Sequence, residues 1–562
     1  MKQEILEILK HLMACAGVTN TEQEKNAEKW MVDFFRSLPY FQRHPDLCGL
    51  YPVPDDPFGR STVWALVTSD KTKIENNEAQ RVNAATADEN KAVSDDPTVI
   101  LMGHHDVVAT DVYGDAAPWA FDLENIAAHL HADRLSPEAY TDLLSGEWLF
   151  GRGSCDMLGG AAVQMAVLKK RAAALLKRQA EAVQNQFYTE PGNAPQETNE
   201  EKGALLFLSV PDEESFSAGM RGAISLLEKL KELYSLDYRL AVCAEPNQRL
   251  ADGKTQVIYS GSIGKLLPVV LVQGKMVQIG SYREGVNPLG ILSRIVAATE
   301  GDETFTETCE GEVSVPPVWT YARDLKEGYD FSLPKQAAGY CNVLTFQKTP
   351  AQVLAYFLGK IRAAVESVPH PVAVMTWVTL WQQAKQHEGF EEFWREAEGQ
   401  IKTQLQEEHK TYPEVTFWLM QATLDFLKLD KPLVLLGFAP PYYPAVRSED
   451  MRSAERFSSY KRVLSALQNV KTEAYFPGVS DCSYCGIPAV TTANAYQANT
   501  PLWGADYRFD AEALARLQIP FFLFGPWGKD LHQIGERVNR YSLTEEYPAV
   551  LEKLLHYVWL SE

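Results

Sequence analysis

Thr98-Val99-Ile100-Leu101-Met102-Gly103-His104-His105-Asp106 is the stretch that decides the fold. Its apolar and β-branched residues run without a break, which is typical of a strand buried on both faces of a parallel sheet. Side chains alternate along a strand, so we expect His104 and Asp106 on one face and His105 on the other. A histidine followed two residues later by a carboxylate suits a metal ligand with its orienting partner. A core histidine paired with an acid is the competing interpretation.

Four further apolar runs end in the same way. The runs at 147–150, 205–210, 238–244 and 519–525 are followed by Asp156, by Glu213 and Glu214, by Glu245, and by His532. In open α/β sheets, ligands bind in the crevice beyond the carboxyl ends of the strands. Five runs that each deliver a histidine or an acid just past their end therefore predict one shared site, and they disfavour scattered surface charges.

These residue types indicate a metal-dependent hydrolase. Two histidines with several carboxylates suit zinc, or a related ion such as cobalt or manganese. Two such ions, about 3.5–4 Å apart, need a bridging ligand, and Asp156 in its glycine-rich turn is the expected one. Glu213 and Glu214 are neighbours, so we expect one to bind metal while the other takes a proton from water. The predicted reaction is cleavage of an amide bond by a metal-bound hydroxide.

The order of the predicted elements gives an α/β protein with a mixed, largely parallel sheet between helices. From about residue 259, strands and helices alternate but contain none of the site segments. We therefore predict a catalytic domain in two parts, 1–261 and 441–562, with an inserted α+β domain at 262–440 that has a helical extension at about 385–430. We also expect a helix at 122–144, a strand at 372–381, and polar loops at about 70–97 and 184–202.

Composition restricts the function classes. The 562 residues carry a formal net charge of -21, which argues against a nucleic-acid partner. No run reaches the roughly 20 apolar residues of a membrane span. Eight scattered cysteines fit reduced thiols in a cytoplasm, and Cys482 and Cys485 form a lone C-x-x-C without the second pair of a structural zinc site. We expect a small-molecule substrate and a monomer or a homodimer.

The site motifs resemble a known family. Gly103-His104-His105-Asp106, Asp156-Met157, Asp212-Glu213-Glu214-Ser215, Glu245-Pro246 and His532 follow the order of the motifs in the di-zinc aminoacylase, acetylornithine-deacetylase and glutamate-carboxypeptidase family. Two further segments, Asp56-Pro57-Phe58-Gly59-Arg60 and Ala439-Pro440-Pro441-Tyr442-Tyr443-Pro444, are similar to the RocB-type arginine-utilisation proteins. That similarity implies a role in amino-acid catabolism.

The resemblance assigns roles to the residues and to the inserted domain. It implies that His104 and Glu245 hold one metal ion, that Glu214 and His532 hold the other, and that Asp156 bridges them. Asp106 would orient His104, and Glu213 would be the general base. The substrate would be a peptide or an N-acyl amino acid. The inserted domain would be a lid or a dimerisation surface.

The chain departs from the family at the residues that contact substrate. A lid histidine of many relatives is replaced by Gln278, and an arginine two residues after Asp481 is replaced by Ser483. Gln278 can still donate a hydrogen bond to an oxyanion, but it adds no charge. Gln278, Asn287 and Asp481 are the candidate substrate contacts. These changes keep an alternative open, a binding protein that retains its metals and has lost turnover.

Overall fold

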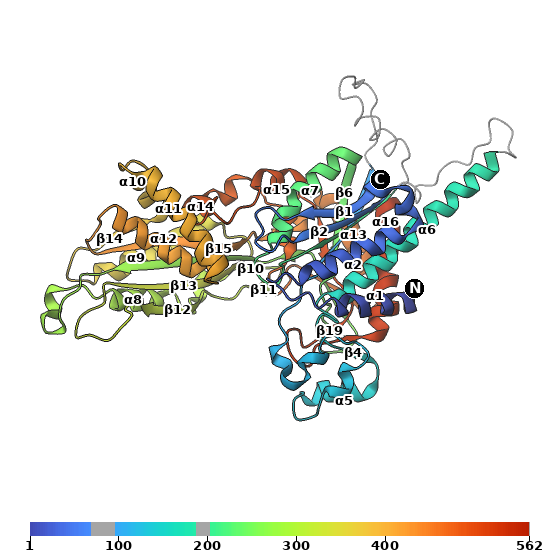
Figure 1. Ribbon diagram of the computed structural model, residues 1–562, viewed down its shortest axis with the longest axis horizontal. Coiled ribbons are helices and arrows are strands. Elements are labelled where there is room, and N and C mark those ends of the chain that lie inside the picture. The colour runs from blue at the N-terminus through green and yellow to red at the C-terminus, as the bar shows by residue number, and fades with distance from the viewer. Residues whose placement is uncertain (69–95, 187–202, 561–562) are drawn as a thin grey trace, which may run out of the picture.

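The structure is a computed structural model in which residues 1–68, 96–186 and 203–560 are described. The two polar loops predicted at about 70–97 and 184–202 lie almost wholly outside these residues. Figure 1 shows an elongated molecule, with a helix-covered sheet at one end and a second, smaller sheet domain projecting from it. The predicted fold class, α/β with an inserted second domain, is confirmed.

The larger sheet has β3 at its centre. Its order is β1-β2-β5-β3-β6-β18-β7-β17, with these bounds: β1 Cys48–Pro52, β2 Ser61–Val67, β3 Asp96–His104, β5 Ala204–Val210, β6 Leu236–Cys243, β7 Gln256–Tyr259, β17 Val470–Glu473 and β18 Phe521–Leu523. β3 pairs in parallel with β5 and with β6, so that His104 is opposite Val210 and Met102 is opposite Cys243. The carboxyl ends of these three strands therefore meet at one edge.

Helices cover the sheet in two layers. α6 (Leu158–Gln186), α1 (Lys2–Ala14) and α16 (Tyr547–Leu560) form the layer that contacts β3, while α7 (Ala218–Tyr234) contacts β2, β5 and β6 and carries α15 (Ala511–Leu517) against it. The remaining helices of this domain are α2 (Glu24–Ser37), α3 (Pro39–Arg43), α5 (Pro137–Ser145) and α13 (Ala454–Ser465). Within the described ranges, none of the helices has both the length and the apolar character for crossing a membrane.

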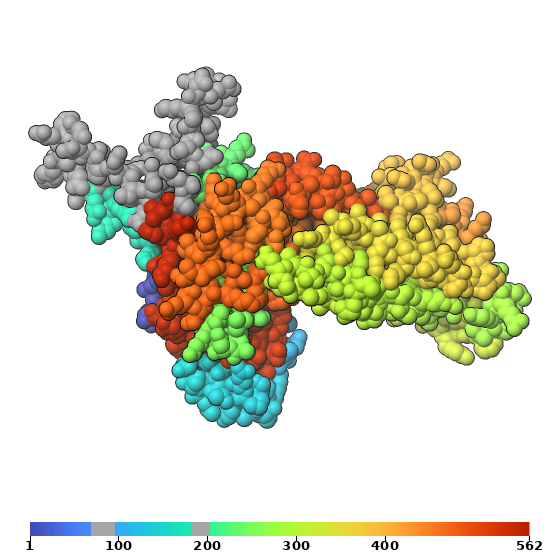
Figure 2. Space-filling model, turned by 180° about the vertical axis from the view of Figure 1, so that it is seen from behind, coloured from blue at the N-terminus to red at the C-terminus, as the bar shows by residue number. Residues whose placement is uncertain are grey.

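The second domain is built on a five-stranded sheet of order β12-β13-β9-β15-β14. Its strands are β9 Gly264–Gln273, β12 Val318–Asp324, β13 Gln336–Thr345, β14 Ala373–Thr376 and β15 Leu433–Tyr443. Its helices are α8 Pro288–Thr299, α9 Pro350–Glu366, α10 Trp377–Lys385, α11 Phe390–Lys402 and α12 Tyr412–Phe426. Figure 2 shows this domain extending away from the rest of the molecule. α14 (Thr491–Asn499), which comes later in the chain, packs against α9 and α10.

Two predicted elements are wrong. The strand expected at 372–381 ends at Thr376, because Trp377, Leu380 and Ala384 recur at helical spacing and are buried on one face of α10. The helix expected at 122–144 is two short helices, Ile126–His129 and α5. The hydroxyl of Ser136 accepts a hydrogen bond from the amide of Ala139 and so starts a new helix at this point.

The glycine pair that begins α6 allows this helix to approach the end of β6. A Cβ atom at Gly160 would lie 2.4 Å from the carbonyl oxygen of Ala244, the residue before Glu245, and one at Gly159 would lie 2.4 Å from the carbonyl oxygen of Ser154. Both distances are well below van der Waals contact. The pair therefore sets the spacing between α6 and the strand that delivers Glu245.

We predict that Gly160→Ala lowers the free energy of unfolding by about 1–3 kcal/mol, because the methyl group forces α6 away from β6. Urea unfolding followed by circular dichroism measures the change. Gly359→Ala is the matched control, since this glycine is exposed on α9 and a Cβ there meets nothing within 4 Å. That variant is expected to gain about 0.5–1 kcal/mol. Equal stability of the two variants would contradict the close-approach argument.

Candidate metal centre

The end of β3 is tied to the turn that follows β5. The imidazole Nδ1 of His104 lies 2.9 Å from the carbonyl oxygen of Asp106 and 3.5 Å from its carboxylate. The same carboxylate accepts hydrogen bonds from the backbone amides of Glu213 and Glu214, at 3.1 and 3.0 Å. Asp106 therefore fixes the orientation of His104 and the position of both glutamates. As expected from strand alternation, His105 points elsewhere, with its Nδ1 3.1 Å from the hydroxyl of Ser209.

Asp156 lies between the two predicted histidine ligands. It follows the glycine-rich turn after β4 (Trp148–Phe150). One carboxylate oxygen is 3.3 Å from Nε2 of His104, and the other is 3.1 Å from Nε2 of His532. Nε2 of His532 is also 3.1 Å from a carboxylate oxygen of Glu214. Two oxygens that face two different imidazoles give the arrangement expected of a bridging carboxylate.

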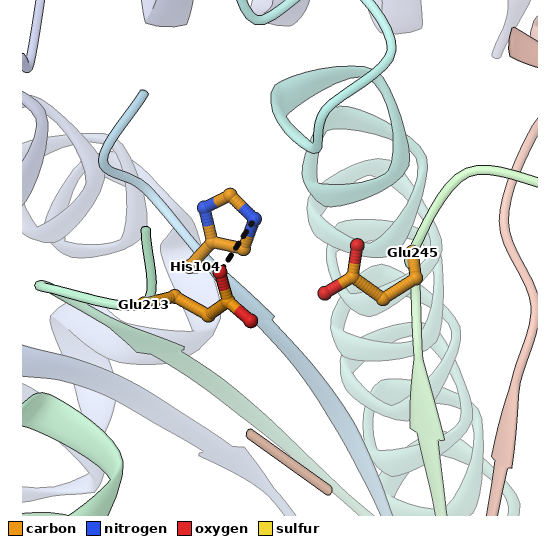
Figure 3. A group of neighbouring side chains, drawn as sticks. All are labelled: His104, Glu213 and Glu245. Carbon is orange, nitrogen blue, oxygen red and sulfur yellow. Dashed lines mark ion pairs between the residues drawn. The ribbon is translucent and has the colours of Figure 1, made fainter. Parts of the chain in front are cut away.

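The remaining glutamates complete the group. Figure 3 shows Glu213 and Glu245 on either side of a common space next to His104. Ligand atoms of His104, Glu213 and Glu245 lie within 4.8 Å of one another, and so do those of His104, Asp156 and Glu214. Imidazole nitrogens and carboxylate oxygens at this spacing are a donor set that suits divalent first-row ions. The structure thus brings together all five residues predicted as metal ligands, together with Glu213.

The buried acids of this group favour the binding of cations. Burial, together with the nearby charge of Asp156, raises the pKa of Glu245 to about 8. Burial also raises the pKa of Glu213. Hydrogen bonds to Asp156 and then to Glu214 raise the pKa of His532 to about 10. Among the described residues, no lysine or arginine forms an ion pair with any of these acids. A bound metal ion would supply the missing positive charge.

The three predicted substrate contacts lie in different places. Asp481 is buried and lies close enough to Glu213 and Glu245 for its charge to raise the pKa of both. Gln278 is exposed beyond the far end of β9 and bridges to Ser332. Asn287 caps α8 by accepting a hydrogen bond from the amide of Leu289. Across the described part of the chain, no hydrogen bond joins Gln278 or Asn287 to the metal-ligand candidates, so the structure does not bring these two to the centre.

A buried arginine that the sequence interpretation left without a role supports the glutamate turn. The guanidinium of Arg60 contacts carboxylate oxygens of Asp56, Glu24 and Asp212, at 2.6, 2.7 and 2.9 Å. Glu24 also accepts a hydrogen bond from the amide of Asp212, at 2.9 Å. Asp212 directly precedes Glu213 and has a positive φ of 68°. In the sequence, only the motif at 56–60 drew attention to Arg60. That motif was recognised as a similarity to other proteins, and no structural role was predicted for it.

A second buried arginine supports the Asp156 turn and the His532 loop. Arg152 forms an ion pair with Glu536 and donates a hydrogen bond to the carbonyl oxygen of His532, at 3.2 Å. Glu536 also accepts a hydrogen bond from the amide of Gly153, at 2.7 Å. These contacts hold together two segments that are distant in the sequence. Nothing in the sequence around Glu536 indicated this role.

We predict that Arg60→Met lowers the free energy of unfolding by about 3–5 kcal/mol, because it leaves three buried carboxylates without their cation. Chemical denaturation of the metal-free protein measures the loss. Arg508→Met is the control in the same region, since its ion pair with Asp55 is exposed, and we expect it to cost less than about 1 kcal/mol. Similar losses in the two variants would contradict the assignment of Arg60.

The chain is similar to two proteins of Bacillus subtilis along most of its length. The chain is 28% identical to the uncharacterized protein YqjN of Bacillus subtilis, over 96% of this chain and 93% of that protein. It is 26% identical to the protein RocB of the same organism, over 94% of this chain and 90% of RocB. No protein-family model matches the chain.

A solved structure shares the fold. It is a tripeptidase from Staphylococcus aureus, with a TM-score of 0.50 at 12% identity, and the match covers 100% of this chain and 99% of the tripeptidase. At this identity the likeness concerns the fold alone. The resemblance to RocB found in the sequence is confirmed: the chain is a homologue of RocB along nearly its whole length, and it shares the fold of the tripeptidase.

Proposed function

We propose that this protein is a two-metal amidohydrolase that cleaves a peptide or an N-acyl amino acid. His104 and Glu245 would hold one divalent ion, His532 and Glu214 the other, and Asp156 would bridge them. Zinc is the first candidate for both ions, with cobalt and manganese as alternatives. When bound, the ions acidify water and polarise the scissile carbonyl. The observation that carries the proposal is the position of Asp156, with one oxygen toward each histidine.

Glu213 is the proton carrier in this proposal. Its side chain lies within 4.0 Å of Nε2 of His104 and faces the same space as Glu245. Because Asp106 holds the amides of both glutamates, Glu213 and Glu214 leave the turn in fixed directions. Glu213 can accept a proton from the attacking water and return it to the leaving nitrogen. A carboxyl group with a raised pKa is suited to both steps.

The relatives of the chain suggest the class of substrate. The relationship to RocB favours a substrate from amino-acid catabolism, arginine-type compounds included. The tripeptidase with the same fold favours small peptides. A metal-retaining binding protein without turnover is the second candidate, and the exposed position of Gln278, which pairs with Ser332, is the observation that favours it.

We predict that Glu213→Gln reduces turnover by about 10²–10⁴-fold, because it removes the proton carrier and preserves the shape of the side chain. The assay is a hydrolysis screen of dipeptides, acyl-arginine and acyl-ornithine with zinc, cobalt or manganese. Metal content, measured by elemental analysis, should remain close to that of the unmodified protein. Unchanged hydrolysis in the variant would remove Glu213 from the mechanism. A complete lack of hydrolysis by the unmodified protein would favour the binding-protein alternative.

We also predict that metal affinity rises with pH. In the metal-free protein the pKa of His532 is about 10, so its imidazole is protonated at neutral pH, and metal binding must displace that proton. Between pH 6 and 8, the association constant for Co²⁺ should therefore rise by about tenfold per pH unit for each proton released. Calorimetry in two buffers of different ionisation enthalpy counts the protons, and His532→Asn should release fewer. An affinity that does not depend on pH would contradict this prediction.

A further inference from the structure

We propose that the carboxylate of Asp481 binds a positively charged nitrogen of the substrate. This inference rests on the proposed function and narrows its substrate class. It concerns a side chain that neither holds metal nor carries the proton in the mechanism above. The nitrogen is either the free α-ammonium group of a peptide or the basic side chain of an arginine-type substrate, and the experiment below distinguishes these two sources.

Asp481 is a buried acid without a partner. It begins the short helix Asp481–Tyr484, only 2% of its surface is exposed, and neither carboxylate oxygen forms a hydrogen bond within the described residues. The hydroxyl of Ser217 is close enough to lower the pKa of Asp481, but it donates its hydrogen bond to the phenol oxygen of Tyr443, at 3.1 Å. Leaving a buried carboxylate unpaired is costly, so native proteins normally give it a donor or a cation. We therefore expect the partner of Asp481 to be a group of the ligand that binds at the centre.

The position of Asp481 places that partner next to the reaction. Its charge acts on Glu213, on Glu245 and on His104. These three residues surround the space shown in Figure 3. A substrate whose scissile bond lies at the metal ions would bring the atoms on one side of that bond toward Asp481.

The charge balance favours a cation even after metal is bound. Six carboxylates lie at the centre: Asp106, Asp156, Glu213, Glu214, Glu245 and Asp481. Two divalent ions supply four positive charges, so two negative charges remain. One of them is Glu213, which needs its charge to accept a proton, and the other is free to attract a positive group of the substrate.

The same loop disfavours a negatively charged group at this position. Ser483 stands two residues after Asp481, and its hydroxyl contacts the hydroxyl of Ser262, at 2.9 Å. Arg60, which contacts Asp212, is occupied by its own three carboxylates. A substrate carboxylate beside Asp481 would meet repulsion without a compensating cation. A positively charged nitrogen would meet an acceptor that is already desolvated.

The test uses the metal-loaded Glu213→Gln protein, in which binding can be measured without turnover. Calorimetry compares two matched pairs of ligands: Ala-Ala with N-acetyl-Ala-Ala, and Nα-acetyl-arginine with Nα-acetyl-citrulline. In each pair the first ligand carries a positively charged nitrogen (the charged member) and the second has an uncharged group in its place (the neutral member), while the carboxylate is common to both. We expect the charged member of one pair to bind at least tenfold more tightly. Adding Asp481→Asn should reduce that ratio to about one by weakening the charged member. Preference in the first pair identifies the α-ammonium group, and preference in the second identifies the basic side chain.

Three controls separate a direct contact from other effects. Asp481→Glu keeps the charge and should retain part of the preference. The preference for the charged ligand is measured again after the salt concentration is raised from 0.05 to 0.5 M. A preference that came from long-range attraction would weaken strongly, whereas one that comes from a buried contact should largely remain. With Glu213 intact, Asp481→Asn should raise KM for the substrate with the positively charged nitrogen much more than KM for its counterpart without that charge.

The inference is overturned if neither pair shows a preference, or if Asp481→Asn weakens charged and neutral ligands equally. Equal weakening with a loss of bound metal would instead assign Asp481 to metal retention. Hydrolysis of the neutral substrates alone would keep the proposed function and reject this inference. Neither binding nor hydrolysis of any of the four compounds would reject both.

Discussion

Mutual repulsion among buried carboxylates is the constraint on which this structure depends. Parallel pairing of β3 with β5 and β6 places the ends of three strands at one edge, and each end delivers acids or a histidine. Asp106 then fixes two glutamates by their amides, so they cannot turn away from one another. The fold thus brings several negative charges close together, and their repulsion lowers the stability of the folded state. Such an arrangement persists only when something positive binds to it.

The chain neutralises buried acids with arginine in two places and leaves the centre itself without one. Arg60 pairs with Glu24, Asp56 and Asp212, and Arg152 pairs with Glu536, in each case just outside the centre. Within the described residues, the only side chains that form ion pairs with the inner acids are the two histidines. This contrast separates the centre from an ordinary buried ion-pair network. It also explains how the supporting turns stay rigid while the inner carboxylates remain available to cations.

The sequence predicted the metal-ligand candidates better than the buried ion pairs that hold them in place. Apolar runs that end in His104, Asp156, Glu214, Glu245 and His532 were recognisable because strand periodicity and ligand chemistry are both local signals. The partners of Arg60 and Arg152 were not, since Asp212 and Glu536 lie 152 and 384 residues away along the chain. The error at 372–381 arose because a four-residue strand passes directly into a helix with the same apolar composition. Gln278 was predicted as a substrate contact from its motif alone. A motif does not show that Gln278 follows a ten-residue strand, β9, which is about 33 Å long.

The free-energy cost of buried charge distinguishes a metal centre from a passive core. Each unpaired buried charge costs several kcal/mol, whereas a whole domain is stable by about 5–15 kcal/mol. The acids must therefore take up protons or bind cations. In the metal-free protein, protonation accounts for Glu245, because burial raises its pKa to about 8. It does not account for Asp156, which two imidazoles hold in its charged form with its oxygens directed to opposite sides. A carboxylate kept ionised between two histidines is a poor core residue and a good bridge between two metal ions.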